Sequence, residues 1–522
     1  MRSFGWRTLG AACLGMTISA YVAPVPAAGQ TAGDDGACMA LTTHALPGGR
    51  VTNARPVAAD TAGMAGSTAL PGGLPAFCRV EVTLVPTVDS DIRVEVWLPR
   101  FGWNGRLQGV GNRGWGGAIN YGLLAGALRD GYAAASTDTG HQGPGSAFAL
   151  GHPEKVVDSG YRAVHEMTVA AKALTRAYYG RAVGRSYWNG CSLGGRQGLA
   201  EAQRYPDDYD GIAVGAPVHN LTQLYAARLV VARTAHRVPA SDIPPAKYPV
   251  IHKAVLAACD PLDGVRDGVI ENPRACRFEP AALRCTAEES DSCLTDTQVD
   301  TLRAMRSPIR HPTTGAVLSA GLEPGAERRL DAIAGPEPEN NALGLFRYVG
   351  LGDPNWDWRG SDFGVAVDRV SAVAGPVLDA VDPDLSRFVA RGGKLLLYHG
   401  WSDPQTPPGN TIDYYSQVVA HLGGNRESES VRLFMAPGVG HCSGGDGPDR
   451  FDVMAPLVKW VEEGIPPSTI EASLVRDETV VRTRPLCAHP SIAVWDGRGD
   501  TNAASSFSCV NTSVPAGRQQ VQ

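Results

Sequence analysis

The chain has 522 residues, 43% of them hydrophobic, and a formal net charge of −6. This length and apolar content allow roughly two or three domains around a large core and exclude a globally disordered chain. The mildly acidic balance, without any run of Lys or Arg, argues against nucleic acid and anionic membranes as partners.

Residues 1–28 are predicted to be a secretory signal peptide. Arg2 and Arg7 supply a positive start, and a mostly apolar or small stretch follows. Ala27 and Ala28 then offer a cleavage site. A membrane anchor is the alternative, but the apolar run is too short to span a bilayer. We therefore expect a secreted or periplasmic protein without membrane attachment after cleavage.

The sequence has 11 cysteines, and ten remain once the signal peptide with Cys13 is removed. An even number in an exported chain predicts disulfides. The count leaves the pairing open, but short separations suggest three bridges: Cys259 with Cys276, Cys285 with Cys293, and Cys487 with Cys509. No two cysteines have the CxxC spacing, which disfavours a zinc site or a redox motif.

Strand and helix signals alternate between residues 93 and 217. Strands are predicted over residues 94–98, 106–110, 132–137, 186–189 and 211–214. Helices are predicted over residues 161–179 and 194–204. This alternation predicts an α/β fold with a mostly parallel sheet that is covered by helices.

The composition changes after Asn220. Residues 221–387 are rich in Pro, Gly and Asp, and strand–helix alternation resumes only beyond them. The simplest interpretation is one α/β core, residues 29–220 and 388–522, interrupted by a large insertion. Such insertions tend to lie over the active site, at the carboxyl ends of the strands.

The sequence GCSLG at residues 190–194 matches the G-x-S-x-G nucleophile elbow. A predicted strand precedes it and a predicted helix follows. Such a turn places the hydroxyl of Ser192 at the positive end of the helix and lets the N–H of Leu193 face a developing oxyanion. The alternative is a glycine-rich turn with a structural serine. We expect Ser192 to be a nucleophile.

An acid and a histidine are expected to follow the nucleophile along the chain, in that order. Asp403 lies just beyond a predicted strand, and His441 lies in a glycine-flanked loop after the next one. Asp446 and Asp449 follow His441, which is the wrong order for the acid. Ser192, His441 and Asp403 are therefore predicted to form a catalytic triad. The triad predicts that the α/β core has the α/β-hydrolase fold and that the insertion is its lid domain.

Two further features are expected beside the triad. The second oxyanion donor should come from the loop GNRGWGG at residues 111–117, with Gly114 as the donor, although a flexible surface turn is the alternative for this loop. Cys191 precedes the serine and Cys442 follows the histidine. Because catalytic partners touch, their chain neighbours are also close, and a disulfide between these two cysteines is expected.

The motifs together resemble the tannase and feruloyl esterase family. The resemblance is carried by CS at residues 191–192, by Asp403, and by HC at residues 441–442. It extends through residues 209–212, 215–217, 484–487 and 504–509. It implies a carboxylic ester hydrolase with a lid domain, five disulfides and a structural calcium ion.

An acidic loop follows Cys259. Asp260, Asp263 and Asp267 are interspersed with glycines, which suits a hard cation. The spacing differs from the EF-hand loop, and the residues alone leave a solvated acidic loop as the alternative. The resemblance implies a Ca²⁺ site that these carboxylates form with the carbonyls of Val265 and Val269.

The predicted function is hydrolysis of small aromatic esters, of hydroxycinnamoyl or galloyl type, through an acyl-enzyme. The resemblance favours it, and so do five lid aromatics, although most of these are expected to form the lid's own core: Phe346, Tyr348, Trp356, Trp358 and Phe363. The family also includes mono(2-hydroxyethyl) terephthalate hydrolase, so terephthalate-type monoesters are an alternative. Thr406 stands where that enzyme is expected to have an aromatic clamp. The residues also leave open a catalytically silent ligand-binding protein and a serine peptidase.

Overall fold

The computed structural model of the protein describes residues 1, 34–60, 64–65, 68–335, 337–338, 340–360, 362–424 and 427–511. The predicted signal peptide, apart from Met1, lies outside these residues. Within the described ranges, no helix is both long enough and apolar enough to cross a bilayer.

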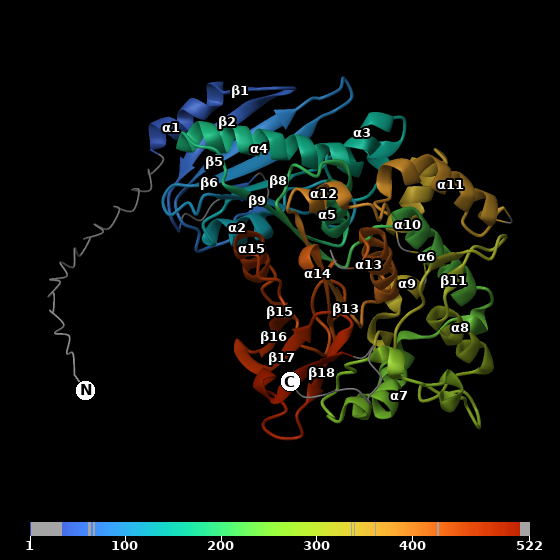
Figure 1. Cartoon of the computed structure of the whole chain (residues 1–522). Coiled ribbons are helices and arrows are strands. Elements are labelled where there is room, and N and C mark those ends of the chain that lie inside the picture. Colours follow the sequence, from blue (N-terminus) through green and yellow to red (C-terminus); the bar gives the residue numbers. More distant parts are fainter. Residues whose placement is uncertain are drawn as a thin grey trace.

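The centre of the molecule is a ten-stranded sheet with the order β1-β2-β5-β6-β8-β7-β9-β10-β13-β14 (Figure 1). Its strands are β1 (Ala45–Leu46), β2 (Gly49–Val57), β5 (Phe77–Leu84), β6 (Ile92–Pro99), β7 (Arg106–Val110), β8 (Ala133–Thr137), β9 (Arg185–Cys191), β10 (Gly211–Gly215), β13 (Lys394–Gly400) and β14 (Val431–Ala436). Each strand predicted from the sequence overlaps one of them.

The sheet is mixed, whereas the sequence predicted it to be mostly parallel. The strands from β8 to β14 in the spatial order pair in parallel. The first four strands, β1, β2, β5 and β6, pair antiparallel, and so does β6 with β8. The connections β1–β2 and β5–β6 are too short to hold a crossover helix, and only antiparallel strands can be joined in that way.

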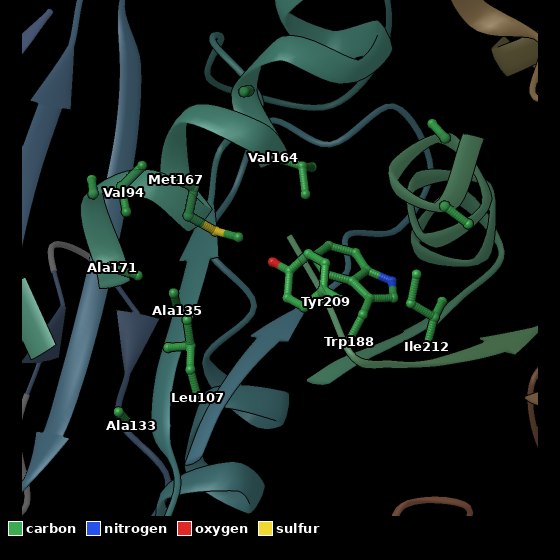
Figure 2. Packing of buried hydrophobic residues seen from close by; sticks show 14 of the residues in the cluster. Val94, Leu107, Ala133, Ala135, Val164, Met167, Ala171, Trp188, Tyr209 and Ile212 are labelled. Carbon is green, nitrogen blue, oxygen red and sulfur yellow. The ribbon is translucent and has the colours of Figure 1, made fainter. Parts of the chain in front are cut away.

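Helices cover both faces of the sheet because successive strand residues point to opposite sides. In β8, Ala133 and Ala135 join the core on one face, and Ala134 joins the core on the other. Figure 2 shows Met167 and Ala171 on the face that carries Ala133 and Ala135. The helices of that face are α4 (Ala163–Tyr179), α5 (Leu193–Arg204) and α13 (Pro408–Leu422); those of the opposite face are α2 (Tyr121–Arg129) and α15 (Met454–Glu463).

The segment between β10 and β13 forms a separate group of helices with a core of its own, at the right of Figure 1. Its elements are α6 (Leu221–Ala235), α7 (Tyr248–Cys259), α8 (Asp296–Arg306), α9 (Asp331–Ala334), α10 (Asn340–Gly344), α11 (Phe363–Leu378), β11 (Ile309–Arg310) and β12 (Val317–Ser319). None of these described elements adds a strand to the ten-stranded sheet. We call this group the lid.

Small elements complete the fold along the chain. They are α1 (Asp35–Ala40), β3 (Met64–Ala65), β4 (Thr68–Ala69), α3 (Pro153–Val157), α12 (Ser386–Ala390), α14 (Glu427–Ser430), β15 (Arg450–Phe451), β16 (Thr469–Arg476), β17 (Thr479–Cys487), β18 (Ser491–Trp495) and β19 (Phe507–Asn511). Strand β17 contacts β14 at the edge of the main sheet. Its Arg484 also reaches the acidic loop of the lid, where Nη2 lies 2.5 Å from Asp267 Oδ2.

Candidate active site

Ser192 lies in a sharp turn between β9 and α5, near the middle of the ten-stranded sheet. Its φ of 63° is in the left-handed region, which a residue other than glycine rarely adopts. Glycines allow this turn to pack closely. A Cβ on Gly190 would lie 2.4 Å from Gly194 O, and one on Gly111 would lie 2.5 Å from Gly194 Cα. The predicted elbow is therefore present in its strand–turn–helix context.

Asp403 follows β13, at the carboxyl end of the strand, and its side chain is fully buried. The backbone N–H groups of Gln405 and Thr406 donate to its Oδ1 over 2.8 and 3.0 Å. His441 follows β14, the neighbouring parallel strand. The acid and the histidine thus leave adjacent strands at the same edge of the sheet.

The three predicted residues lie in one hydrogen-bonded chain. His441 Nε2 is 2.8 Å from Ser192 Oγ, and His441 Nδ1 is 2.7 Å from Asp403 Oδ2. The histidine side chain is 17% exposed, so a substrate can reach it. Burial alone would raise the pKa of Asp403, but the nearby imidazoles of His441 and His399 outweigh it and hold that pKa well below its usual range. Asp403 is therefore an anion that can stabilise a protonated His441.

His399, a residue that the sequence interpretation missed, also contacts the acid. Its Nε2 lies 3.1 Å from Asp403 Oδ2, and its Nδ1 lies 2.8 Å from Thr411 Oγ1. His399 is the penultimate residue of β13 and is fully buried. A histidine at the end of a strand whose centre is the apolar run 395–397, four positions before the acid, is the signal that could have identified it.

The predicted disulfide beside the triad is present. Cys191 and Cys442 are bonded, with 6.0 Å between their Cα atoms, and the bridge joins the elbow to the histidine loop across 251 positions. The three pairs suggested by spacing are also confirmed. A fifth bridge joins Cys38 to Cys78, which completes the five disulfides that the resemblance implied.

The two aspartates excluded by chain order do not bond to His441 in the described structure. Asp449 accepts a hydrogen bond from Gly444 N over 2.7 Å.

Asp446 pairs with His252 of α7, whose Nε2 lies 3.1 Å from Asp446 Oδ2, and also with Arg328. His252 Nδ1 lies 3.3 Å from Glu327 Oε2. We call the contact of His252 with Asp446 and Glu327 the His252 bridge; it connects the lid to the histidine loop.

The loop at residues 111–117 contacts the elbow through its first two residues. Gly194 N donates to Asn112 O over 3.0 Å, and Asn112 N donates to Gln197 Oε1 over 3.0 Å. Trp115 is buried in the lid core, where its Nε1 lies 3.3 Å from Asn341 O.

Of the two predicted oxyanion donors, Gly114 is exposed, with a φ of 59°. Leu193 is the first residue of α5, directly after the serine. Oxyanion donation by Leu193 and Gly114 stays a prediction.

Two cavities lie beside the triad. One, of about 220 Å³, is lined by His441, Ser402 and Gln405, together with the lid residues Arg328 and Arg329. The other, of about 450 Å³, is lined by the Cys191–Cys442 bridge and by the loop at residues 111–113, with Asn189 and Asp449. Both the core and the lid therefore border the space around the triad.

The lid aromatics mostly form the lid's own core, as expected. Phe346 stacks on Trp356 with a centroid distance of 4.9 Å and on Phe363 with 5.9 Å. Phe346, Phe363 and Trp358 are buried. These buried side chains therefore serve packing of the lid.

The acidic loop folds around Asp260. The carboxylate of Asp260 accepts hydrogen bonds from Asp267 N over 3.2 Å and from Gly268 N over 3.1 Å. Burial, with a smaller contribution from neighbouring carboxylates, raises the pKa of Asp263 to about 6 and that of Glu271 to about 8. Several acidic groups are thus close together in a loop that the Cys259–Cys276 bridge closes.

A family model described as tannase and feruloyl esterase matches residues 78–510 of the chain. The chain belongs to this family. It is 38% identical to an uncharacterized esterase of Xanthomonas campestris pv. campestris, over 92% of each chain. It is 32% identical to a probable feruloyl esterase B-2 of Aspergillus terreus, over 83% of this chain and 86% of that one.

A solved structure gives the same result. The crystal structure of feruloyl esterase B from Aspergillus oryzae superposes with a TM-score of 0.85 at 28% identity, covering 91% of this chain and all of that one. The family and these relatives identify the protein as a carboxylic ester hydrolase with the predicted α/β-hydrolase fold.

Proposed function

We propose that the protein is an exported serine esterase for aromatic acyl esters, with Ser192 as nucleophile, His441 as general base and Asp403 as its orienting acid. The observation that carries this proposal is the hydrogen-bonded chain of Ser192, His441 and Asp403. The same order and roles are found in serine hydrolases that form an acyl-enzyme.

The reaction follows from this geometry. Ser192 Oγ attacks the ester carbonyl while His441 Nε2, 2.8 Å away, accepts its proton. The tetrahedral oxyanion then accepts hydrogen bonds from Leu193 N–H and from the loop at residues 111–117, where Gly114 is the proposed donor. The C–O bond to the alcohol breaks as His441 returns the proton to the departing oxygen. Water, activated by His441, then hydrolyses the acyl-enzyme.

Hydroxycinnamoyl or galloyl esters are the proposed substrates. The names of the relatives, probable feruloyl esterase B-2 and feruloyl esterase B, support this class. Thr406 argues against terephthalate-type monoesters as substrates. Its side chain is fully buried, and its backbone N–H donates a hydrogen bond to Asp403 Oδ1. A substrate clamp at this position would need an accessible side chain. The intact triad argues against a silent binding protein.

Export is the proposed location, either to the periplasm or outside the cell. Five disulfides support it, because such bridges persist in oxidising compartments. The predicted signal peptide agrees with it.

We also propose that the acidic loop binds one structural Ca²⁺. The proposed ligands are the carboxylates of Asp260, Asp263 and Asp267 and the carbonyls of Val265 and Val269. This set contains only oxygen donors, which Ca²⁺ prefers. The closure of this loop by the Cys259–Cys276 bridge and the burial of Asp260 support the fit, because they keep the carboxylates close together. When bound, the ion would offset two of the three negative charges of its aspartate ligands.

The test is a substrate panel measured with the wild type and with Ser192→Ala. It contains methyl ferulate, methyl gallate, chlorogenate, mono(2-hydroxyethyl) terephthalate and a peptide p-nitroanilide. We expect a hydroxycinnamate or gallate ester to have the highest kcat/KM, and the variant to lose roughly 10⁴-fold or more in kcat. A preference for the terephthalate ester would refute the substrate class. A variant that keeps a tenth of the wild-type rate would refute the nucleophile.

A further inference from the structure

The catalytic acid has two imidazole partners on a single oxygen. Asp403 Oδ2 lies 2.7 Å from His441 Nδ1 and 3.1 Å from His399 Nε2. Its other oxygen, Oδ1, accepts the backbone N–H groups of Gln405 and Thr406. A simple triad needs only one imidazole on the acid. The second imidazole therefore needs an explanation beyond the catalytic chain itself.

The contacts of His399 assign its protonation. Nε2 faces two acceptors, Asp403 Oδ2 at 3.1 Å and Thr406 O at 2.8 Å, so it must carry a hydrogen. Nδ1 lies 2.8 Å from Thr411 Oγ1, whose hydroxyl can donate to it. A neutral ring with its proton on Nε2 satisfies all these groups, and His399, Asp403 and Thr411 are all fully buried.

The charged and titratable groups near His399 are the Asp403 anion, His441, His219 and Arg228. Burial lowers the pKa of His219 to about 4, so the ring of His219 is neutral. Asp403 therefore provides one negative charge that two imidazoles share.

We infer that His399 is a positioning residue that sets how strongly Asp403 holds the proton on His441; this rests on the proposed function of the triad. The Nε2–H of His399 takes part of the charge on Oδ2 and fixes the plane of the carboxylate. Without it, the full charge acts on His441. The imidazolium then forms more readily but releases its proton to the leaving alcohol less readily. His399 thus tunes the general base without touching the substrate.

The test compares His399→Gln with His399→Met. The two side chains have similar length and shape, but only the Gln amide can donate a hydrogen bond in place of Nε2–H. We expect the Met variant to lose about 10- to 100-fold in kcat at little cost in KM, the range of a lost hydrogen bond to a charged group. The acidic limb of its kcat/KM profile should move up by about 0.5–1 pH unit. The Gln variant should restore most of the rate and the position of the limb.

A purely structural role would lower the amount of folded protein equally for both variants and leave the limb in place, and that result would overturn the inference. So would a Met variant with the wild-type rate and limb. If the Met variant does not fold, ¹⁵N spectra decide: the histidine signal that is absent from His399→Gln should show a hydrogen on Nε2, and an Nε2 without a hydrogen refutes the inference. Ser192→Ala, measured alongside, separates this outcome from failure of the triad itself.

Discussion

In the proposed mechanism, the nucleophile elbow and the histidine loop present the two halves of one proton transfer, yet they are built in opposite ways. The elbow is set by local backbone: a strand, a turn with a positive φ at Ser192, and a helix, packed closely through Gly190 and Gly194. The histidine loop has no regular structure around His441. It is held by the disulfide to Cys191, by Asp403 and by the lid through the His252 bridge.

This difference shows which part of the site is robust. The turn of the elbow is set by its own strand and helix and by core residues such as Asn112 and Gly215, so changes in the lid should leave Ser192 in place. The position of His441 depends on contacts that come from segments far away in the sequence. A Cβ on Gly438, at the start of the histidine loop, would lie 2.7 Å from Gly447 N and 3.2 Å from Val269 Cγ1. The loop therefore folds on itself and against the acidic loop, and it should be the first part of the site to lose its geometry.

The largest expected effect comes from removing the acid that orients His441. Asp403→Asn should lower kcat by about 10⁴-fold with little change in the fold, because the amide favours the wrong imidazole tautomer. The measurement is steady-state hydrolysis, with the melting curve as the check on folding. Asp449→Asn is the matched control, since Asp449 bonds to Gly444 N and not to His441. Equal losses in both variants would contradict the assignment of the acid.

The disulfide next to the triad should have the second largest effect. The double variant Cys191→Ala, Cys442→Ala should lose about 2–4 kcal/mol of stability, because the bridge limits the unfolded chain. It should also lose rate in the fraction that stays folded, since His441 is then less firmly held. The control is Cys285→Ala with Cys293→Ala, which opens a bridge of separation 8 within the lid. Similar turnover in the folded fractions of both double variants would show that the bridge beside the triad serves stability alone.

Metal removal should act on stability before chemistry. If Ca²⁺ binds the folded acidic loop, it stabilises the protein by about 2.7 kcal/mol when the free ion is at 100 times its dissociation constant. Chelation should lower the melting temperature, and added Ca²⁺ should restore it, whereas hydrolysis should persist in protein that stays folded. The control is Asp263→Asn, which should melt lower and respond less to chelation. An unchanged melting curve after verified removal of metal would contradict the proposed site.

The His252 bridge should give the smallest effect, and one that depends on pH. Burial would lower the pKa of His252, but hydrogen bonds to Asp446 and Glu327 outweigh it and raise the pKa to about 9 from an ordinary 6.5. The raised pKa means that the bridge contributes its full stability below about pH 6.5 and loses it as the pH rises through about 9. His252→Gln should therefore cost about 1–3 kcal/mol near pH 6 and little above pH 10. Urea unfolding curves of the wild type and the variant at the two pH values measure this loss of stability. A loss that grows as the pH rises would contradict the prediction.

The same contrast explains what could be predicted from the sequence. The elbow has a local motif, and its partners are expected in a fixed order after strands, so Ser192, Asp403 and His441 were predicted together, and the structure places them in one hydrogen-bonded chain. The insertion was predicted from its composition, and the segment between β10 and β13 forms a group of helices with a core of its own. The disulfide of Cys191 and Cys442 followed from their positions next to the touching residues.

Other features have no local signature. The antiparallel half of the sheet was missed. No strand was predicted at β1, β2 or β5, and β6 was placed in a mostly parallel sheet because only its short connection to β5 indicates its direction. His252 and Glu327 are far from Asp446 along the chain, so their contact appears only in the folded structure. His399 was the exception, since a buried histidine in an apolar strand could have been noticed.

The most direct test of the triad is covalent labelling of the nucleophile. An aryl phosphonate ester that mimics the tetrahedral intermediate should inactivate the enzyme with one label per chain, and peptide mass mapping should place this label on Ser192. Asp403→Asn should be labelled far more slowly, because His441 no longer activates the serine, whereas Asp449→Asn should be labelled at the wild-type rate. A label on any other residue, or hydrolysis that persists after Ser192 is fully labelled, would contradict the central claim that Ser192 is activated by His441.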